Sequence, residues 1–347
     1  MPDMTQRRWY PTATTQRNGN VLVVAGQKWA NAQANIPEVW QSAAGTWRSL
    51  TTAPKELPLY PWMYQAPDGR VFNAGPNFNT GFLDTEARGG TGEWAEAPIP
   101  GSLRNYPRNA GTSVMYRPGR ILNIGGAAEL VHNTTELIDL PATTTGSPTF
   151  TAGPPMVFRR AHVNSTLLAD GTVLVTGGTD ATTPSEEGAV YNAELWTPPT
   201  TAFPIGQWSL MAPMQKPRLY HSVALLLPDA TVLSTGGGQG ANFPNQPTWE
   251  IFTPPYLCKG LARPEIASAP QAITYGQDFQ IASPDAGNIL PSGRVTLVRL
   301  SSITHSFNMN QRFLELIPLS AKNGEVYLKA PGDKNLCPPR PLHAVPH

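Results

Sequence analysis

Residues 170–179 read DGTVLVTGGT, which is a turn, a run of β-branched and apolar residues, and a closing pair of glycines. The Asp-Gly pair suits a tight hairpin turn, in which the backbone adopts positive φ angles. The closing glycines allow the chain to bend sharply where other backbone segments approach it. This stretch therefore predicts a hairpin strand that ends at a sharp bend.

The same pattern occurs five times along the chain, with its last glycines near positions 26, 75, 126, 178 and 237. An apolar strand precedes each copy, and an aromatic strand follows several of them. A period of about 50 residues, with four short strands per repeat, is typical of the kelch class of β-propeller. We predict an all-β fold in which an incomplete kelch-type propeller of about five repeats occupies residues 1–258. The copies span residues 18–27, 68–76, 118–127, 170–179 and 229–239.

The composition fits this prediction and excludes several classes of function. The chain of 347 residues contains 37 prolines and 31 glycines, as expected for short strands joined by many turns. A net charge of +1, with 14% charged residues, indicates no nucleic-acid partner. No apolar run approaches the ~18 residues of a membrane helix, and the first residues lack the apolar segment of a signal peptide. The two cysteines, Cys258 and Cys337, do not form a disulfide framework.

The pattern changes after Pro254-Pro255. Segments such as QDFQIAS (277–283) and GEVYLKA (324–330) alternate between apolar and polar residues, which predicts an immunoglobulin-like β-sandwich over residues 259–347. The final stretch, RPLHAVPH, resembles neither a strand nor a domain ending. We expect these last residues to be aberrant. A one-base frameshift near Arg340 accounts for them, and His343 and His347 are then accidental rather than metal ligands.

Two places in this fold carry side chains suited to metal chemistry. Tyr220 and His221 are adjacent at the entrance to a strand of the last repeat, where rigid scaffolds commonly present functional residues. One imidazole nitrogen beside one phenol oxygen suits a mixed nitrogen and oxygen site such as that of Cu(II), and the alternative is a hydrogen-bonded surface pair. His305 lies in a polar loop of the terminal domain, and its alternative is a loop residue without a role.

Three longer segments contain these residues: RRWYPTATTQRNGNVLVVAG (7–26), RLYHSVALLLPD (218–229) and ITHSFNMNQR (303–312). In this order they resemble the copper radical oxidases, the family of galactose oxidase and glyoxal oxidase, and the RWYP form is nearer to the glyoxal oxidase branch. The resemblance covers nearly the whole chain. It implies a seven-bladed kelch propeller with one mononuclear copper ion on its axis, followed by a β-sandwich.

The resemblance also implies residue roles. Tyr10 matches the equatorial tyrosine that carries a radical, and Tyr220 matches the axial tyrosine that accepts a proton. His221 and His305 match the two histidine ligands, so that two imidazoles and two phenols hold the copper. Trp29 follows the first closing glycine and matches a tryptophan that stacks over the radical tyrosine in galactose oxidase. For Trp29, packing between blades is the alternative.

The implied activity is the oxidation of a small aldehyde or primary alcohol by O2 to give H2O2. We expect a monomeric protein that is extracellular in its full-length form. Because propellers serve many functions, a non-catalytic propeller that binds carbohydrate or protein is the alternative, as is an inactive fragment of the oxidase. Arg104 and Arg108 precede the third repeat, where they either bind substrate oxygen atoms or lie in solvent as loop charges.

The sequence departs from the family at the crosslink of the radical tyrosine. In the family, a thioether joins this tyrosine to a cysteine in an earlier blade. Tyr10 lies only nine residues from the start, and neither Cys258 nor Cys337 matches that cysteine. The thioether is therefore not possible within this chain. We interpret the chain as N-terminally truncated, since five repeats replace the family's seven blades and no signal peptide precedes them.

Overall fold

The computed structural model describes residues 2–29, 32–183, 185–239, 244–260, 263–289, 294–339 and 342–346. Within these ranges the protein consists mainly of strands and turns. Its helical segments there are α1 (Ala87–Gly90), α2 (Ala286–Ile289) and the 3-10 turn η1 (Pro255–Leu257), and none of them is long and apolar enough to cross a membrane. The all-β class predicted from the sequence is confirmed.

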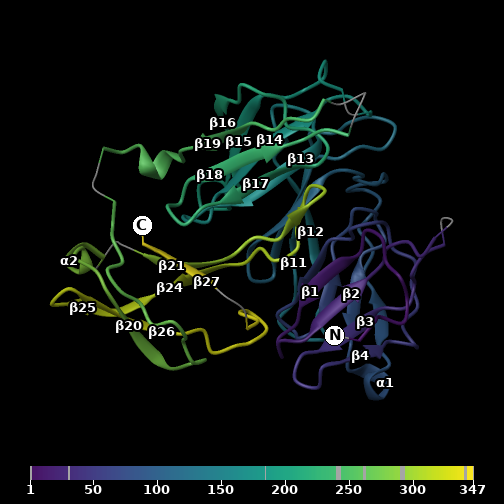
Figure 1. The fold of residues 1–347 in the computed structure, drawn as a ribbon, viewed down its shortest axis with the longest axis horizontal. Coiled ribbons are helices and arrows are strands. Elements are labelled where there is room, and N and C mark those ends of the chain that lie inside the picture. The colour runs from purple at the N-terminus through teal and green to yellow at the C-terminus, as the bar shows by residue number, and fades with distance from the viewer. Residues whose placement is uncertain are drawn as a thin grey trace.

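Five antiparallel sheets follow one another along the chain, one for each glycine repeat (Figure 1). Strands that neighbour one another in each sheet are consecutive in sequence, so every sheet is a meander, as in the blade of a propeller. The predicted propeller of about five repeats is confirmed. The first three sheets contain β1 (Thr12–Thr15), β2 (Val21–Val24), β3 (Glu38–Gln41), β4 (Thr46–Ser49); β5 (Met63–Gln65), β6 (Val71–Asn73), β7 (Gly81–Asp84), β8 (Glu93–Glu96); and β9 (Thr112–Arg117), β10 (Arg120–Ile124), β11 (Thr135–Asp139), β12 (Thr149–Gly153). The last two contain β13 (Ala161–Leu167), β14 (Val173–Thr179), β15 (Asn192–Thr197), β16 (Gln207–Pro213); and β17 (Ser222–Leu226), β18 (Val232–Gly236), β19 (Trp249–Phe252).

The closing glycines are required where neighbouring blades meet. Gly177 ends the repeat of the fourth blade at a φ of 67°, and a Cβ atom there would lie 2.3 Å from the carbonyl oxygen of Arg218 in the fifth blade. Gly125 of the third blade shows the same close approach, since its Cβ would lie 2.6 Å from the carbonyl oxygen of Arg160. Only glycine combines this backbone angle with this contact.

An ion pair between an arginine and a glutamate recurs in four of the five blades, and the arginine side chain is buried in each. The arginine precedes the first strand of its blade, and the glutamate lies on the third strand. One guanidinium nitrogen also donates to a backbone carbonyl at the end of the second strand. A paired and hydrogen-bonded charge of this kind fixes the entrance of the first strand. The pairs are Arg8–Glu38 (2.9 Å), Arg108–Glu136 (3.1 Å), Arg160–Glu194 (2.9 Å) and Arg218–Glu250 (3.4 Å).

This repeated pair corrects both readings of Arg104 and Arg108. Arg108 is 1% exposed and pairs with Glu136, and Arg104 is 3% exposed with a guanidinium nitrogen 2.8 Å from the same carboxylate. Neither side chain lies in solvent, and neither is free to bind a substrate. An arginine that precedes a strand in the sequence can be an exposed loop residue, or it can be buried against the third strand of the same blade. Its position in the sequence does not distinguish the two.

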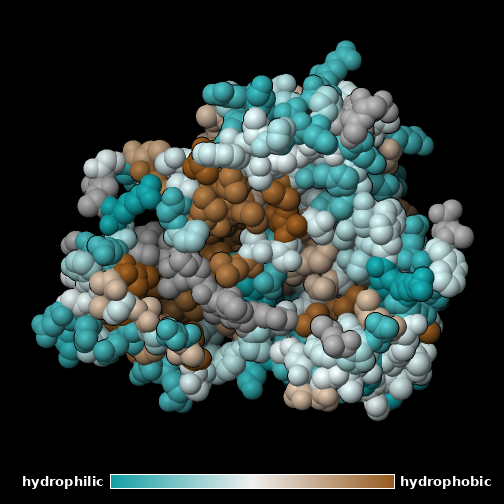
Figure 2. All heavy atoms as spheres, viewed as in Figure 1, coloured by the Kyte–Doolittle hydropathy of each residue, from teal (hydrophilic) through white to brown (hydrophobic). Residues whose placement is uncertain are grey.

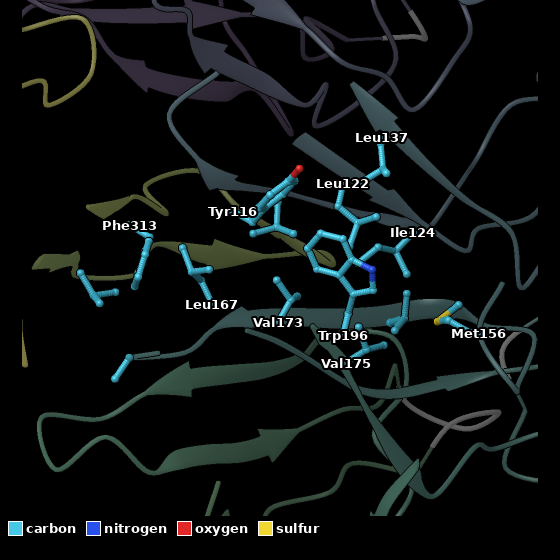
Figure 3. Packing of buried hydrophobic residues seen from close by; sticks show 14 of the residues in the cluster. Tyr116, Leu122, Ile124, Leu137, Met156, Leu167, Val173, Val175, Trp196 and Phe313 are labelled. Carbon is cyan, nitrogen blue, oxygen red and sulfur yellow. The ribbon is translucent and has the colours of Figure 1, made fainter. Parts of the chain in front are cut away.

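An apolar cluster joins the third blade, the fourth blade and the terminal domain. Trp196 of β15 is fully buried at its centre, and its ring meets the ring of Tyr116 edge-on at a centroid distance of 4.8 Å. Figure 3 shows the indole between Leu122 of β10 and Val175 of β14, with Phe313 farther along the same cluster. Because Phe313 belongs to the terminal domain, that domain packs directly on the propeller.

The fifth sheet has one core face and one apolar surface. Ala224 and Val232 are fully buried against the fourth blade. Side chains that alternate with them point away from that blade. Among these, Trp249 and Ile251 are 66% and 43% exposed. Figure 2 shows apolar surface, in brown, over β17 and β18.

The terminal domain contains two three-stranded sheets and a hairpin. One sheet has the order β20-β26-β25 and the other β24-β21-β27. The hairpin of β22 and β23 extends from this domain to the blades (Figure 1), where Phe307 packs against Tyr64 and Met115. The strands are β20 (Asp278–Ala282), β21 (Val295–Arg299), β22 (Ile303–Thr304), β23 (Phe307–Asn308), β24 (Phe313–Leu316), β25 (Pro318–Lys322), β26 (Glu325–Lys329) and β27 (Leu342–Pro346).

The expectation that the final residues form no strand is wrong. β27 (Leu342–Pro346) pairs with β21 over five residues in an antiparallel register. The free edge of β21 offers unpaired backbone groups, and a short following segment satisfies them whatever its side chains are. His343 lies on β27 opposite Val298, and its side chain is outside the described part of the structure. Arg340 and His347 also lie outside the described residues.

Candidate metal centre

Five equivalent backbone positions, one in each blade, share an unusual conformation. The residues are Tyr10, Tyr60, Ala110, His162 and His221, and their φ angles are 64°, 49°, 53°, 57° and 66°. A positive φ is uncommon for residues other than glycine and costs about 1–3 kcal/mol. Each residue lies at or just before the first strand of its blade. The repeated left-handed turn is therefore a feature of the blade, and it directs five side chains towards one region.

The structure brings the four predicted ligands together. The hydroxyl oxygens of Tyr10 and Tyr220 are 3.4 Å apart, although 210 residues separate them in sequence. The ring of His221 lies 3.9 Å from that of Tyr220 and 4.8 Å from that of His305. The ring of His305 lies 4.4 Å from that of Tyr10. The first blade, the fifth blade and the terminal hairpin thus meet at one point.

Hydrogen bonds at the two histidines leave one ring nitrogen of each available. Nδ1 of His221 lies 2.9 Å from the carbonyl oxygen of Gly238, which only accepts, so Nδ1 carries the proton and Nε2 keeps its lone pair. Nδ1 of His305 lies 2.6 Å from Oγ1 of Thr304, and its Nε2 is buried with no hydrogen-bond partner. An unsatisfied buried nitrogen is costly, and outer hydrogen bonds of this kind orient histidine ligands of metals.

These donors fit a copper ion. Two imidazole nitrogens and two phenol oxygens suit Cu(II). Among the residues that the structure describes, no group of three or more His, Cys, Asp or Glu side chains is arranged to hold a metal ion. A metal centre at this point therefore depends on the phenols of Tyr10 and Tyr220 as well as on His221 and His305.

The protonation states follow from burial. Desolvation, together with the neighbouring His221, lowers the pKa of His305 to about 4, so its imidazole is neutral at physiological pH. Desolvation raises the pKa of Tyr220, and the hydrogen bond with Tyr10 raises it further. Without a metal ion Tyr220 is therefore a protonated phenol. A bound divalent cation opposes this effect and favours the phenolate.

The ring that stacks on Tyr10 is Trp9 rather than Trp29. The two ring planes of Trp9 and Tyr10 are 17° apart, with centroids separated by 3.7 Å. Trp29 is 66% exposed and lies beneath the guanidinium group of Arg7 at 5.6 Å. Adjacent residues of an extended chain point in opposite directions, but the positive φ of Tyr10 turns the two rings to the same side.

Two further rings at the site were missed by the sequence analysis. Tyr60 lies 4.7 Å from Tyr10 and stacks on His305 at 4.6 Å. His162 meets Tyr220 edge-on at 5.2 Å, and desolvation lowers the pKa of His162 to about 4. Aligning the five repeats on the residue at the entrance of each first strand identifies both. That position has no sequence motif of its own, because tyrosine, alanine and histidine all occupy it.

A cavity of about 200 Å³ opens beside the cluster. Phenol and imidazole groups line it together with small and apolar groups. Its lining residues are Tyr10, Tyr60, His162, Tyr220, His305 and Ser306, with Leu59, Trp62, Pro76, Ala110 and Gly111.

The fold and the cluster define a β-propeller protein with a centre of tyrosines and histidines. Residues 2–256 match the model of the glyoxal oxidase N-terminus, and residues 263–344 match that of the galactose oxidase-like early set domain. The chain belongs to the copper radical oxidase family, as the resemblance of its three segments predicts.

Individual relatives agree with this family. The chain is 28% identical over 97% of its length to a galactose oxidase of Gibberella zeae, and equally to the aldehyde oxidase GLOX1 of Arabidopsis thaliana. It spans 52% and 61% of the lengths of these two proteins. Among solved structures, a fungal alcohol oxidase of the AA5 family, in complex with copper, matches with a TM-score of 0.85 and 26% identity. That match covers 99% of this chain and 75% of the other.

Proposed function

We propose that Tyr10, Tyr220, His221 and His305 hold a single copper ion in a copper radical oxidase that acts on a small aldehyde or primary alcohol. The convergence of two phenols and two histidines, one with a buried and unpaired Nε2, carries this proposal. The family membership supports it, as do relatives that are a galactose oxidase, an aldehyde oxidase and a copper-bound alcohol oxidase.

The reaction removes two electrons and two protons from the substrate. A primary alcohol and O2 give an aldehyde and H2O2, and a hydrated aldehyde and O2 give a carboxylic acid and H2O2. Copper supplies one site for an electron and makes a nearby hydroxyl more acidic when it is bound. The protein must therefore provide a proton acceptor and a store for the second electron.

Tyr220 and Tyr10 supply these two functions in our proposal. Tyr220 borders the cavity, and its phenolate is a competent base for the hydroxyl proton of the substrate. In its oxidised form Tyr10 is a phenoxyl radical, which takes a hydrogen atom, and with it the second electron, from the substrate carbon and becomes a phenol. The indole of Trp9, stacked on Tyr10 at 3.7 Å, shields this ring from solvent. Tyr60 stacks on His305 and holds its ring in place.

The two cysteines lie away from Tyr10. Cys337 is buried in the core of the terminal domain, and Cys258 is exposed beside η1. Neither is placed to form a thioether with Tyr10, so we propose that the chain alone binds copper but stabilises the radical poorly. A copper-binding protein without oxidase activity is accordingly the second candidate function.

We extend the proposal to the organisation of the protein. Residues 1–258 form the propeller domain and residues 259–347 the sandwich domain. We propose a monomer that is secreted in its full-length form, with a small-molecule aldehyde, alcohol or carbohydrate and O2 as its reaction partners.

Peroxide production by the copper-loaded protein tests the proposed function. Metal-free protein receives one equivalent of Cu(II), and H2O2 is measured with a series of small aldehydes and primary alcohols. We expect Tyr220→Phe to lower any peroxide production at least about 100-fold, since the proton acceptor is lost. Tyr191→Phe, which removes an exposed phenol on another part of the propeller, is the control. Tight copper binding without peroxide from any substrate would favour the second candidate function.

A further inference from the structure

The third blade differs from the other four at the shared left-handed position. Tyr10, Tyr60, His162 and His221 carry aromatic rings there, whereas the third blade carries Ala110. The cavity lies against this alanine and the glycine that follows it. Gly111 must itself remain small, because a Cβ atom there would meet the carbonyl oxygen of Ile124 at 2.9 Å. The cavity therefore lies where the third blade lacks the ring that the other blades provide.

The lining of the cavity combines two kinds of group. Leu59, Trp62 and Pro76 are apolar. The other large lining residues carry groups that can form hydrogen bonds, and these are Tyr10, Tyr60, His162, Tyr220, His305 and Ser306. Four of these already have a place in the proposed centre, as ligands or as the ring stacked on a ligand. His162 is the imidazole that the proposed reaction does not use.

His162 is held firmly, but its ring is not engaged by the fold. Its backbone N–H donates to the carbonyl oxygen of Ala110 at 2.6 Å, and Arg160, two residues earlier, is anchored to the buried Glu194. Within the described residues, no side-chain hydrogen bond reaches the imidazole, and no third histidine joins His221 and His305 in a metal-binding arrangement. The aromatic ring that contacts it is that of Tyr220, which it meets edge-on at a centroid distance of 5.2 Å.

We propose that His162 determines substrate specificity by hydrogen-bonding a second oxygen atom, on the carbon next to the one that is oxidised. This inference rests on the proposed function, in which the reacting oxygen lies near Tyr220. A two-carbon substrate with oxygen at both ends can then reach both side chains. A substrate with a methyl group in that place leaves the imidazole desolvated and unpaired, and sites of this kind discriminate strongly against such analogues.

Ethylene glycol and 1-propanol test this preference, because they differ only by a hydroxyl in place of a methyl group. Copper-loaded protein is titrated with each alcohol without O2, and the Cu(II) absorption and EPR spectra report binding. We expect the native protein to bind ethylene glycol at least about 10-fold more tightly, beyond the factor of two for its equivalent ends. His162→Phe keeps a ring of similar size and is expected to bring the ratio close to one. His162→Gln, which still forms hydrogen bonds, is expected to retain part of the preference.

His132→Phe is the matched control. This histidine stacks on Tyr106 in the third blade and does not line the cavity, so its replacement should leave the ratio unchanged. An unchanged ratio in His162→Phe overturns the inference but leaves the proposed function standing, because copper still binds. A loss of copper affinity in His162→Phe also overturns it, because His162 is then a ligand. Failure of the native protein to bind copper removes both the proposed function and the inference.

Discussion

The third and fourth blades show how scaffold and chemistry are separated in this protein. Both place a buried arginine two residues before the shared left-handed position, and both pair it with a glutamate on the third strand. The backbone at that position is nearly the same, with φ of 53° at Ala110 and 57° at His162. Only the side chain differs. The arginine fixes the strand entrance in both blades, and the residue two positions later is free to set the chemistry of the site.

The largest expected effect is a loss of stability, and its size should differ between the ion pair of the fourth blade and that of the third. Arg160→Met leaves Glu194 buried without its cation, and breaking such a pair costs about 3–5 kcal/mol. Arg108→Met should cost clearly less, because Arg104 remains 2.8 Å from Glu136. Thermal unfolding of the two variants, compared with the native protein, measures both losses. Equal losses would show that Arg104 does not support Glu136 and that the two blades are held in the same way.

A second variant makes the third blade resemble the fourth. Ala110→His places an imidazole where the cavity now lies, and its backbone angle is tolerable because histidine is enriched in the left-handed region. We expect binding of small alcohols to fall at least about 10-fold through loss of space, with copper affinity unchanged. Titration of the copper-loaded variant checks this result. Unchanged alcohol binding would show that the substrate lies elsewhere.

The smallest expected effect is on how the stability of the metal-free protein depends on pH. Burial lowers the pKa of His162 to about 4, while an unfolded histidine has a pKa near 6.5. Between these values the unfolded chain binds more protons, so the metal-free protein loses stability as the pH falls from about 6.5 towards 4. The third blade has no such group at Ala110. His162→Phe should therefore shrink the decrease in melting temperature between pH 7 and pH 5.

His162→Phe should not abolish the decrease in melting temperature between pH 7 and pH 5. The pKa of His305 is also lowered to about 4, and His305 remains in the variant. A decrease in melting temperature that is identical in His162→Phe and the native protein would show that His162 titrates normally in the folded state.

The sequence predicts the blades well because the residues that determine them are close together in the sequence. A hairpin turn and a closing glycine are required by backbone geometry within ten residues, and the five copies correspond to five sheets. Tyr220, His221 and His305 stand out in the sequence as candidates, and the resemblance to a family adds Tyr10 and gives all four the role of ligands. The structure places them in contact. Whether they bind copper stays a prediction.

Other parts of the site could not be predicted because they depend on the direction in which side chains point and on contacts between residues that are far apart in the sequence. The left-handed turn at Tyr10 brings Trp9 onto its ring, and nothing in the sequence marks that turn. His162 becomes part of the site through the same turn in the fourth blade. Arg104 and Arg108 resemble loop charges until the position of Glu136 is known. The terminal strand β27 is recruited by the free edge of β21 rather than by its own side chains.

The EPR spectrum of protein loaded with one equivalent of Cu(II) tests whether the first blade, the fifth blade and the terminal hairpin form one copper site. We predict hyperfine coupling to two imidazole nitrogens, from His221 and His305, because each histidine has one nitrogen available. His305→Ala should then show coupling to one imidazole nitrogen, and His132→Ala should match the native spectrum. A spectrum that His305→Ala leaves unchanged would show that copper is bound without the terminal hairpin and that the proposed four-residue site is wrong.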